Sequence, residues 1–403
     1  MWIKKYLRHT SFFAASLLFA LFITVPSAFA AGYTWTNVTQ STPESGQRWY
    51  SVDMSSDGKY QAASTINGYV YTSDDYGATW NPVTALGAGV DGSVAVSSSG
   101  QYMYTLFVGG DIYKSSNYGA TWTNMTQSSS AHDLNWVSVS TSASGQFVAA
   151  ASQGGDIWKS NDYGASWTDT SNALGSKLWG TVNMSSTGQY IAGVTVSSGD
   201  LYVSNNYGST WTNISSIGAH DWSDVTVSDN GKYMAADVWI GNVYVSSDYG
   251  QTWTPELTGL GNQTWAGITS TSSGQTMMAG ITNSDLYISN DYGQTWSDAT
   301  SSAAISGSFW TALATSSTGE YVTVGNDGSD IWTGLDPTLA PVAPSSPTSS
   351  SSSGDPPTGS AAKAPDTGYG APRNLNLLPV ACISASITLI TAGFRLLRLK
   401  PLY

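Results

Sequence analysis

Two His-Asp dipeptides are the clearest candidates for catalytic or metal-binding chemistry in this sequence. His132-Asp133 and His220-Asp221 lie in equivalent connections of two repeat units that are not adjacent, one before Trp136 and one before Trp222. A carboxylate beside an imidazole can act as a general acid or base, or the two can ligate a metal ion. The alternative is that both pairs lie in solvated loops. No zinc-ligand spacing, glycine-rich phosphate loop or Ser-His-Asp signature stands out, so the sequence indicates no cofactor and no metal. Asp133 and Asp221 are therefore weak catalytic candidates.

A second set of candidates is aromatic. Six tryptophans recur at the start of a predicted strand: Trp49, Trp136, Trp179, Trp222, Trp265 and Trp310. An indole ring can stack on a sugar ring and donates one hydrogen bond, so six rings around a channel mouth would form a glycan-binding surface. The alternative is that each ring packs between neighbouring repeats, and the regular spacing itself favours this packing role.

The elements that must position these residues are repeated. An eight-residue segment, seen as Ser160-Asn-Asp-Tyr-Gly-Ala-Ser-Trp167, occurs six times. Its copies end at Trp80, Trp122, Trp167, Trp211, Trp253 and Trp296. A polar turn ending in glycine keeps the same period but occurs seven times. Its glycines are Gly58, Gly100, Gly145, Gly188, Gly231, Gly274 and Gly319. Seven turns with six segments indicate seven repeat units.

Each unit reads as four short strands, for example 136–140, 146–151, 156–159 and a fourth that begins with the final Trp of the segment. Short strands on a period of 40 to 50 residues are typical of propeller blades. Residues 33–37 read as a fourth strand with no segment before it, and 330–333 read as a third strand with no fourth after it. We therefore predict an all-β fold, a seven-bladed β-propeller of four-stranded blades over residues 31–338. The N-terminal strand completes its last blade and removes the open sheet edges.

The repeated segment resembles the Asp-box, or BNR repeat, S-x-D-x-G-x-T-W. Its third position is Asp75, Asn117, Asp162, Asn206, Asp248 or Asp291. The resemblance places the chain beside sialidases, xyloglucanase-like glycosidases, sortilin-type receptors and photosystem assembly factors, and implies that the boxes lie away from any active site. We expect these side chains to accept hydrogen bonds within their own turns.

Charge excludes several functions. Residues 31–367 contain seven basic and 27 acidic side chains, so nucleic acid is not an expected partner. The resemblance to sialidases implies a triad of arginines around the substrate carboxylate, but Arg48 is the only arginine between 31 and 338. We predict a monomeric, non-catalytic binding or adhesion module for an extracellular glycan or surface protein. The alternatives are a xyloglucanase-like glycoside hydrolase and a sortilin-like or assembly-factor-like propeller that binds a protein or peptide.

The two ends of the chain predict export and surface attachment. Residues 1–30 have the basic start, apolar run and small-residue site of a signal peptide, with cleavage between Ala30 and Ala31. A Ser/Pro-rich linker, 339–363, precedes the motif 364–368 and an anchor with a basic tail, 369–403. Pro365, Thr367 and Gly368 match a sortase cell-wall sorting signal, which implies a sortase-type transpeptidase that cuts after Thr367. Residues 375–394 are apolar enough to span a membrane. We expect the protein on the extracellular face of a bacterium, held by its wall or membrane.

Overall fold

The computed structural model describes residues 32–89, 92–300, 305 and 309–339. Contacts divide the chain into one unit from Met1 to Ala343 and another from Pro344 to Tyr403, and the described residues all lie in the first. The predicted signal peptide, sorting motif and membrane anchor lie outside the described residues, as does the linker beyond Leu339. Within the described ranges, no helix is long and apolar enough to cross a membrane.

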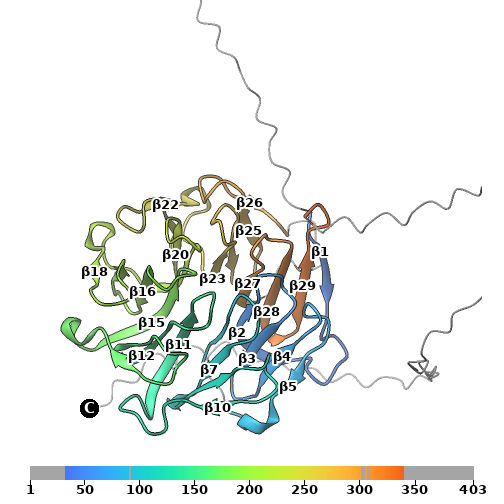
Figure 1. The fold of residues 1–403 in the computed structure, drawn as a ribbon. Coiled ribbons are helices and arrows are strands. Elements are labelled where there is room, and N and C mark those ends of the chain that lie inside the picture. The colour runs from blue at the N-terminus through green and yellow to red at the C-terminus, as the bar shows by residue number, and fades with distance from the viewer. Residues whose placement is uncertain (1–31, 90–91, 301–304, 306–308, 340–403) are drawn as a thin grey trace, which may run out of the picture. The chain divides into compact units, whose positions relative to one another are not determined.

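The described chain is all-β, and its repeats form antiparallel strands in sequence order (Figure 1). The fifth repeat has β19 (Trp222–Val227), β20 (Met234–Val238), β21 (Val243–Ser246) and β22 (Thr254–Glu256). The sixth has β23 (Trp265–Ser270), β24 (Met277–Ile281), β25 (Leu286–Ser289) and β26 (Ser297–Asp298). The second strand of each is almost wholly buried, because both of its faces pack against neighbouring repeats.

The first four repeats follow the same order. The first has β2 (Gln47–Met54), β3 (Gln61–Thr65), β4 (Val70–Ser73) and β5 (Asn81–Pro82), and the second has β6 (Val94–Val96), β7 (Met103–Leu106), β9 (Ile112–Ser115) and β10 (Thr123–Asn124), with β8 (Val108–Gly110) inserted. The third has β11 (Leu134–Thr141), β12 (Val148–Gly155), β13 (Ile157–Ser160) and β14 (Thr168–Asp169), and the fourth has β15 (Lys177–Met184), β16 (Ile191–Thr195), β17 (Leu201–Ser204) and β18 (Thr212–Asn213). Short 3-10 helices lie in four connections between repeats: η1 (Thr84–Leu86), η2 (Asn172–Leu174), η3 (Ser215–Ile217) and η4 (Thr258–Leu260).

The first and last described strands pair with each other. β27 (Trp310–Thr315), β28 (Tyr321–Ser329) and β29 (Ile331–Leu335) form the end of the repeat array. β1 (Thr34–Asn37) lies antiparallel to β29, from Thr34 opposite Leu335 to Asn37 opposite Trp332 (Figure 1). The two ends of the array therefore share one sheet.

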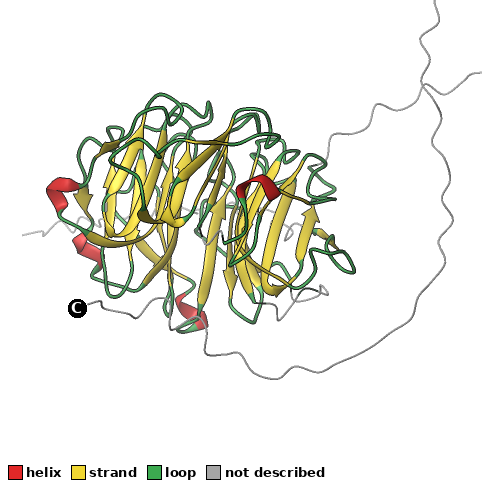
Figure 2. Ribbon diagram, turned by 90° about the horizontal axis from the view of Figure 1, so that it is seen from below, coloured by secondary structure: helices red, strands yellow, loops and turns green. Residues whose placement is uncertain are grey.

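The strands end in two sets of loops. Figure 2 shows strands running side by side with loops gathered at both ends. Because the strands are antiparallel, the turn after the first strand and the repeated segment after the third lie at the same end of each sheet. We call this the box end, and we call the end where the chain enters the first strand the entry end.

At the box end, the turn of each repeat is hydrogen-bonded to the turn of the next. Ser56 N–H donates to the Ser98 carbonyl over 2.9 Å, and Ser317 N–H donates back to the Ser56 carbonyl over 2.9 Å. The complete order of donors is Ser56, Ser98, Ala143, Ser186, Asp229, Ser272 and Ser317. These seven bonds form a closed cycle that links every repeat to its two neighbours.

The first strands are joined by side chains. Their free-edge N–H groups need partners, and in the second to sixth repeats a polar side chain of the preceding repeat accepts from one of them. Ser138 Oγ accepts from Val182 N over 3.0 Å, and Asn183 Oδ1 accepts from Val227 N over 3.1 Å. A β-bulge after the tryptophan, as between Trp222 and Asp224, sets the direction of these side chains.

The apolar core lies between adjacent repeats. In one cluster, Leu201 and Val203 of the fourth repeat contact Trp222, Val225 and Val238 of the fifth. Similar clusters recur around the other described repeats, and most contain one of the first-strand tryptophans. Packing between sheets therefore supplies the stability of a chain that has no disulfide in its described part.

Candidate functional site

The six first-strand tryptophans are buried. Trp49, Trp136, Trp179, Trp222 and Trp265 are 0% exposed and Trp310 is 1% exposed. Trp222, for example, has His220 and Tyr244 against its ring at centroid distances of 5.1 and 5.3 Å. Neither face of such a ring is free to stack on a sugar, which corrects the expectation of a tryptophan binding surface. The rings pack between neighbouring repeats, which is the alternative role that their regular spacing favoured.

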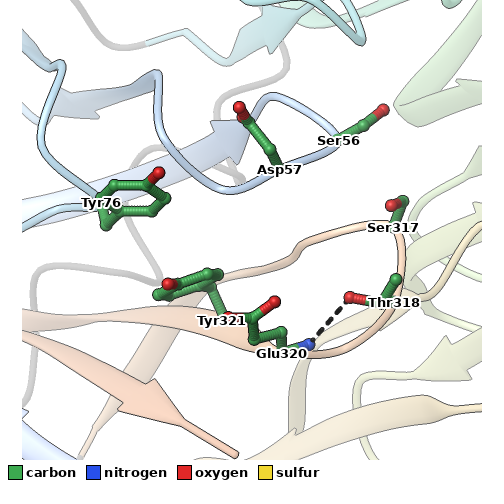
Figure 3. Close-up of a pocket in the computed structure, with 7 residues that line it drawn as sticks. All are labelled: Ser56, Asp57, Tyr76, Ser317, Thr318, Glu320 and Tyr321. Atoms are coloured by element: carbon green, nitrogen blue, oxygen red, sulfur yellow. Dashed lines mark hydrogen bonds between the residues drawn. The ribbon is translucent and has the colours of Figure 1, made fainter. Parts of the chain in front are cut away.

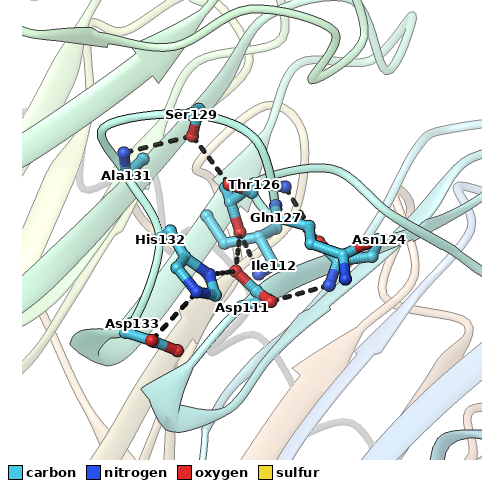
Figure 4. Close-up of polar contacts among 9 residues, drawn as sticks. All are labelled: Asp111, Ile112, Asn124, Thr126, Gln127, Ser129, Ala131, His132 and Asp133. Atoms are coloured by element: carbon cyan, nitrogen blue, oxygen red, sulfur yellow. Dashed lines mark hydrogen bonds and ion pairs between the residues drawn. The ribbon is translucent and has the colours of Figure 1, made fainter.

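His132 and Asp133 belong to a polar cluster at the entry end (Figure 4). Asp111 Oδ1 accepts from Thr126 Oγ1 over 2.6 Å and contacts His132 Nδ1 at 2.8 Å. His132 Nε2 lies 2.9 Å from Asp133 Oδ2. The hydrogen bond to Asp111 is the main reason that the pKa of His132 is raised. The Asp133 side chain is 65% exposed, so it resembles a surface ion pair more than a general acid.

Asp111 itself is part of a repeated structural device. An acid just before the third strand accepts a hydrogen bond from a hydroxyl just after the fourth. Ser171 Oγ donates to Asp156 Oδ1 over 3.2 Å, and Thr39 Oγ1 donates to Asp330 Oδ1 over 3.1 Å. This hydrogen bond joins the end of the fourth strand to the start of the third strand in several repeats. Only the His132-Asp133 part of the cluster is therefore specific to its repeat.

His220 and Asp221 have different partners, and these come from two neighbouring repeats. His220 Nε2 lies 2.9 Å from the Ile217 carbonyl and 3.1 Å from the Tyr244 hydroxyl. Asp221 Oδ1 accepts from the Ser197 N–H over 2.9 Å. The strands that follow the two pairs, β11 and β19, are separated by β15 of the intervening repeat. Asp133 thus pairs with its sequence neighbour His132, and Asp221 accepts from the turn between β16 and β17 of the preceding repeat, so the two carboxylates do not meet as a catalytic pair.

The third-position residues of the repeated segments are occupied by their own turns. Asp162 Oδ1 accepts from Ser160 Oγ over 2.8 Å and from Ser166 N over 2.8 Å, while its Oδ2 accepts from Ser166 Oγ over 2.6 Å. Partial burial opposes ionisation, but the hydrogen bonds outweigh it and lower the pKa of Asp162. In all six segments the third-position Oδ1 accepts from the backbone N–H four residues later. The accepting residues are Asp75, Asn117, Asp162, Asn206, Asp248 and Asp291.

Carboxylates on the inner strands behave in the opposite way. Asp53 Oδ2 accepts from Val96 N over 2.7 Å, and burial raises the pKa of Asp53 to about 6. Burial also raises the pKa of Asp224 to about 6. Asp237 Oδ1 accepts from Asp224 N over 2.6 Å, and burial together with the Asp224 charge raises the pKa of Asp237 well above its usual range. Burial therefore opposes ionisation of these acids inside the fold, and the described residues contain no group of three side chains suited to a metal ion.

The aromatic residues that reach the surface are tyrosines of the repeated segment, a feature that the sequence analysis did not single out. Each has a positive φ, such as 63° at Tyr76 and 65° at Tyr249, and several are about 40% exposed. Each stacks on an aromatic residue of the preceding repeat. The pairs are Tyr76–Tyr321, Tyr118–Tyr60, Tyr163–Tyr102, Tyr207–Phe147, Tyr249–Tyr190 and Tyr292–Tyr233. A positive φ is strained for a bulky residue, so these tyrosines are held in place by the contact between repeats.

An open pocket of about 360 Å³ lies at one of these contacts, where the last repeat meets the first (Figure 3). Tyr76 and Tyr321 form its aromatic wall, with ring centroids 4.8 Å apart. Asp57 and Glu320 add carboxylates, and three small hydroxyl side chains complete the lining. The sequence signal for this site was available only as a departure from the repeat, because Asp57 and Glu320 are far apart along the chain.

No known family model matches the chain, and no curated protein sequence matches it significantly. Solved structures do resemble it. YCF48 from Cyanidioschyzon merolae is 14% identical, with a TM-score of 0.58 over 74% of this chain and 98% of that one. YCF48 bound to D1 peptide is 13% identical, with a TM-score of 0.60 over 75% and 97%. The GH74 xyloglucanase from Xanthomonas campestris is 18% identical, with a TM-score of 0.58 over 75% of this chain and 53% of that one.

These similarities define the class of fold. The neighbours are β-propellers, and the described chain shares their all-β architecture. The chain spans about half the length of the xyloglucanase. At such identities the likeness concerns the fold alone, and function has to be argued from the site.

Proposed function

We propose that this chain is an exported, surface-anchored β-propeller of seven blades that acts as a non-catalytic binding module. The closed cycle of seven turn-to-turn hydrogen bonds supports seven blades, and the pairing of β1 with β29 supports closure of the last blade by the N-terminal strand. The partner is an extracellular glycan or a surface protein. The acidic surface supports the exclusion of nucleic acid, and the protein acts as a monomer.

The observation that carries this proposal is the contrast between carboxylates and exposed tyrosines. A glycoside hydrolase needs two carboxyl groups facing one substrate, roughly 5 to 10 Å apart. Asp133 instead pairs with His132, and Asp221 accepts from Ser197 N of the preceding repeat. The half-exposed tyrosines at the box end, with the pocket at one of their contacts, offer a surface for recognition. Tyrosine combines a large apolar face with a polar tip and is common in binding sites.

Attachment to the cell surface is part of the same proposal. Cleavage between Ala30 and Ala31 would release the exported chain, and a sortase-type enzyme would cut between Thr367 and Gly368. Retention through residues 375–394 is the other route to surface display. Mass spectrometry of envelope fragments is expected to find a C-terminus at Thr367, whereas fragments that end at Tyr403 would contradict cleavage.

Binding and hydrolysis are separated by one set of assays on the full-length protein. Glycan and peptide arrays are expected to give saturable binding, and polysaccharides incubated with the protein are expected to release no reducing sugar. Sugar release that Asp133→Asn or Asp221→Asn abolishes would overturn the non-catalytic assignment in favour of a hydrolase. The absence of any bound glycan or peptide would contradict a binding module.

A further inference from the structure

The contact between the last and first repeats differs chemically from the other contacts at the box end. Two carboxylates flank its stacked tyrosines in the pocket of Figure 3. Asp57 belongs to the turn after β2, and Glu320 immediately precedes β28. Tyr76 comes from the repeated segment after β4, and Tyr321 begins β28. Four side chains from both ends of the array therefore converge on one open space.

The aromatic wall of the pocket is fixed in position. The Tyr321 side chain packs directly over Gly58, where a Cβ would lie only 2.9 Å from Tyr321 Cβ. Tyr76 covers Tyr321 from the other side, with an angle of 30° between the rings. Tyr76 is nevertheless 41% exposed, so part of its ring remains available to a ligand.

The carboxylates give the pocket a negative field. Asp57 Oδ1 accepts from Ser55 Oγ over 2.6 Å and from Lys59 N over 3.0 Å, both within its own turn. Burial raises the pKa of Tyr321 to about 12, and the neighbouring Glu320 carboxylate adds to the effect. Burial alone disfavours any charge, so only the part of this shift that comes from the Glu320 and Asp57 carboxylates indicates a negative field, which favours a cation.

Comparison of the repeats shows that folding does not require either acid. The residues at the position of Glu320 in the other repeats are Lys59, Gln101, Gln146, Gln189, Lys232 and Gln275. The residues at the position of Asp57 are Ser99, Ser144, Thr187, Asn230, Ser273 and Thr318. Only the contact between the last and first repeats combines an acid at both positions. The pair is an addition to the repeat pattern, in the way expected of a binding feature.

The chain contains its own example of the ligand. Where a lysine replaces Glu320, its ammonium group lies over the aromatic ring that follows it. Lys59 Nζ is 4.9 Å from the Tyr60 ring centroid, and Lys232 Nζ is 5.0 Å from that of Tyr233. These cations are attracted to the ring faces. At the last-to-first contact that position is Glu320. The nearby Lys59, whose charge acts on Asp57 and Tyr76, has its ammonium group over the Tyr60 ring, and the residues that line the pocket include no lysine or arginine.

We propose that this pocket binds one cationic side chain of a protein partner, a lysine or an arginine. The cation lies against Tyr76 and Tyr321 and forms an ion pair with Glu320 and Asp57. The inference rests on the proposed function, which it deepens by naming the chemistry that the partner presents. A charge-assisted contact with a carboxylate is shorter and stronger than a neutral hydrogen bond, and the aromatic wall adds a cation–π contribution.

The test uses the full-length protein with tyrosine side chains labelled for NMR, and three short peptides. The probes are acetyl-Gly-Lys-Gly-amide, acetyl-Gly-Arg-Gly-amide and the neutral isostere with norleucine in place of lysine. Both cationic peptides are expected to shift the Tyr76 and Tyr321 signals until binding saturates, and with lower affinity at high salt. The norleucine peptide is expected to leave both signals unchanged. Tyr76→Phe and Tyr321→Phe assign the two signals.

Variants locate the site. Glu320→Gln introduces the residue of four other repeats and is therefore expected to fold normally, while weakening the lysine peptide about five- to tenfold. Glu44→Gln removes an acid elsewhere on the surface and is expected to leave binding unchanged. The double variant Gln101→Glu with Ser144→Asp builds the same acidic pair at the contact of the second and third repeats. It is expected to add a response at Tyr102 and Tyr163.

The outcomes separate this inference from the proposed function. Equal binding of the lysine and norleucine peptides, or an unchanged affinity in Glu320→Gln, would overturn the cation site. If glycan or peptide arrays still gave saturable binding, the binding module would stand without it. Conversely, lysine binding that depends on Glu320 in a protein that released sugar through Asp133 would retain the cation site and reject the non-catalytic function.

Discussion

The inner strands and the box end both carry an aromatic residue in six of the seven repeats, yet the two sets serve different purposes. The inner tryptophans are 0–1% exposed, whereas tyrosines such as Tyr76 and Tyr118 are 41% and 44% exposed. The tryptophans fill space between repeats, and the tyrosines stack at the surface on an aromatic ring of the preceding repeat. Equal periodicity in a sequence therefore does not mean equal function, because burial decides which set a ligand can reach.

The two regions differ in the same way in their acids. Burial raises the pKa of Asp53 on an inner strand, whereas hydrogen bonds outweigh the effect of burial and lower the pKa of Asp162 in a repeated segment. Burial opposes ionisation of the inner acids, whereas the outer acids are stabilised as anions by their own turns. Mutations can test this division between an inner region that packs the core and an outer region whose tyrosines stack on neighbouring repeats.

The largest effect is expected from truncating an inner tryptophan. Trp222→Ala leaves a large cavity between the fourth and fifth repeats and is expected to cost about 3–5 kcal/mol of unfolding free energy. Tyr249→Ala, at the box end of the fifth repeat, removes a half-exposed ring and is expected to cost about 1 kcal/mol. Denaturant unfolding followed by tryptophan fluorescence measures both. Equal losses would erase the distinction between the two sets.

A second test concerns pH. The folded chain holds a proton on Asp53 up to about pH 6, while an unfolded aspartate loses it near pH 4. Stability therefore falls as pH rises from about 4 to about 6, and the penalty is fully present above that range. Asp53→Asn is expected to flatten this decline by about 1–3 kcal/mol.

The repeat supports the choice of asparagine at this position. Asn183 occupies the corresponding place in the fourth repeat and makes the matching bond to Val227 N. The asparagine variant is therefore expected to keep the bond to Val96. An unchanged slope of unfolding midpoint against pH between 4 and 7 would show that Asp53 is not the group that holds the proton.

A smaller effect is expected in the repeated segments. Asp162→Ala removes the acceptor for three hydrogen bonds within one turn and is expected to cost about 1–2 kcal/mol. Asp162→Asn is expected to cost less than about 0.5 kcal/mol, because Asn117 accepts the equivalent bond from Thr121 N over 2.9 Å. Thermal unfolding of the pair measures the difference. A large loss in the asparagine variant would mean that the charge itself is required.

The smallest effect is expected at the contact between the sixth and last repeats, which has no stacked tyrosine pair. The last repeat has no repeated segment, and Thr276 of the sixth repeat stands where the other repeats have a tyrosine or phenylalanine. Tyr33 donates instead to the Gly319 carbonyl over 2.7 Å. Tyr33→Phe is expected to cost about 1 kcal/mol and to increase hydrogen exchange in β1 selectively. Unchanged exchange in β1 would assign the junction to some other contact.

The sequence predicted the repeat unit well because glycine turns and alternating strands are local signals. The four strands expected around 136–169 appear as β11 to β14, within the usual uncertainty of strand ends. The exposure of the aromatic residues was harder to predict. The regular spacing of the tryptophans favoured packing, but the tyrosines of the repeated segment are just as regular, and only the coordinates show that Trp49 is buried and Tyr76 is 41% exposed. The shared role of Asp111, Asp156 and Asp330 also required coordinates, since each is a single acid before a strand.

The pocket between the last and first repeats was hidden for a related reason. Asp57 and Glu320 belong to turns at opposite ends of the array, and only closure of the array brings them together. A comparison of repeats could have noted that Glu320 replaces glutamine or lysine. It could not have shown that the replacement faces Asp57 across a stacked pair of tyrosines.

The closed cycle of turn-to-turn bonds also bears on how the protein reaches its folded state. The side-chain bond from Thr323 to Gln61 joins residues 262 positions apart, and β1 has no partner strand until β29 has been synthesised. Contacts across such long loops carry an entropic cost that must be met before they become stabilising, so folding is expected to be slow. The N-terminal strand must wait for the last repeat. The export proposed above would therefore require the chain to stay unfolded until its translocation is complete.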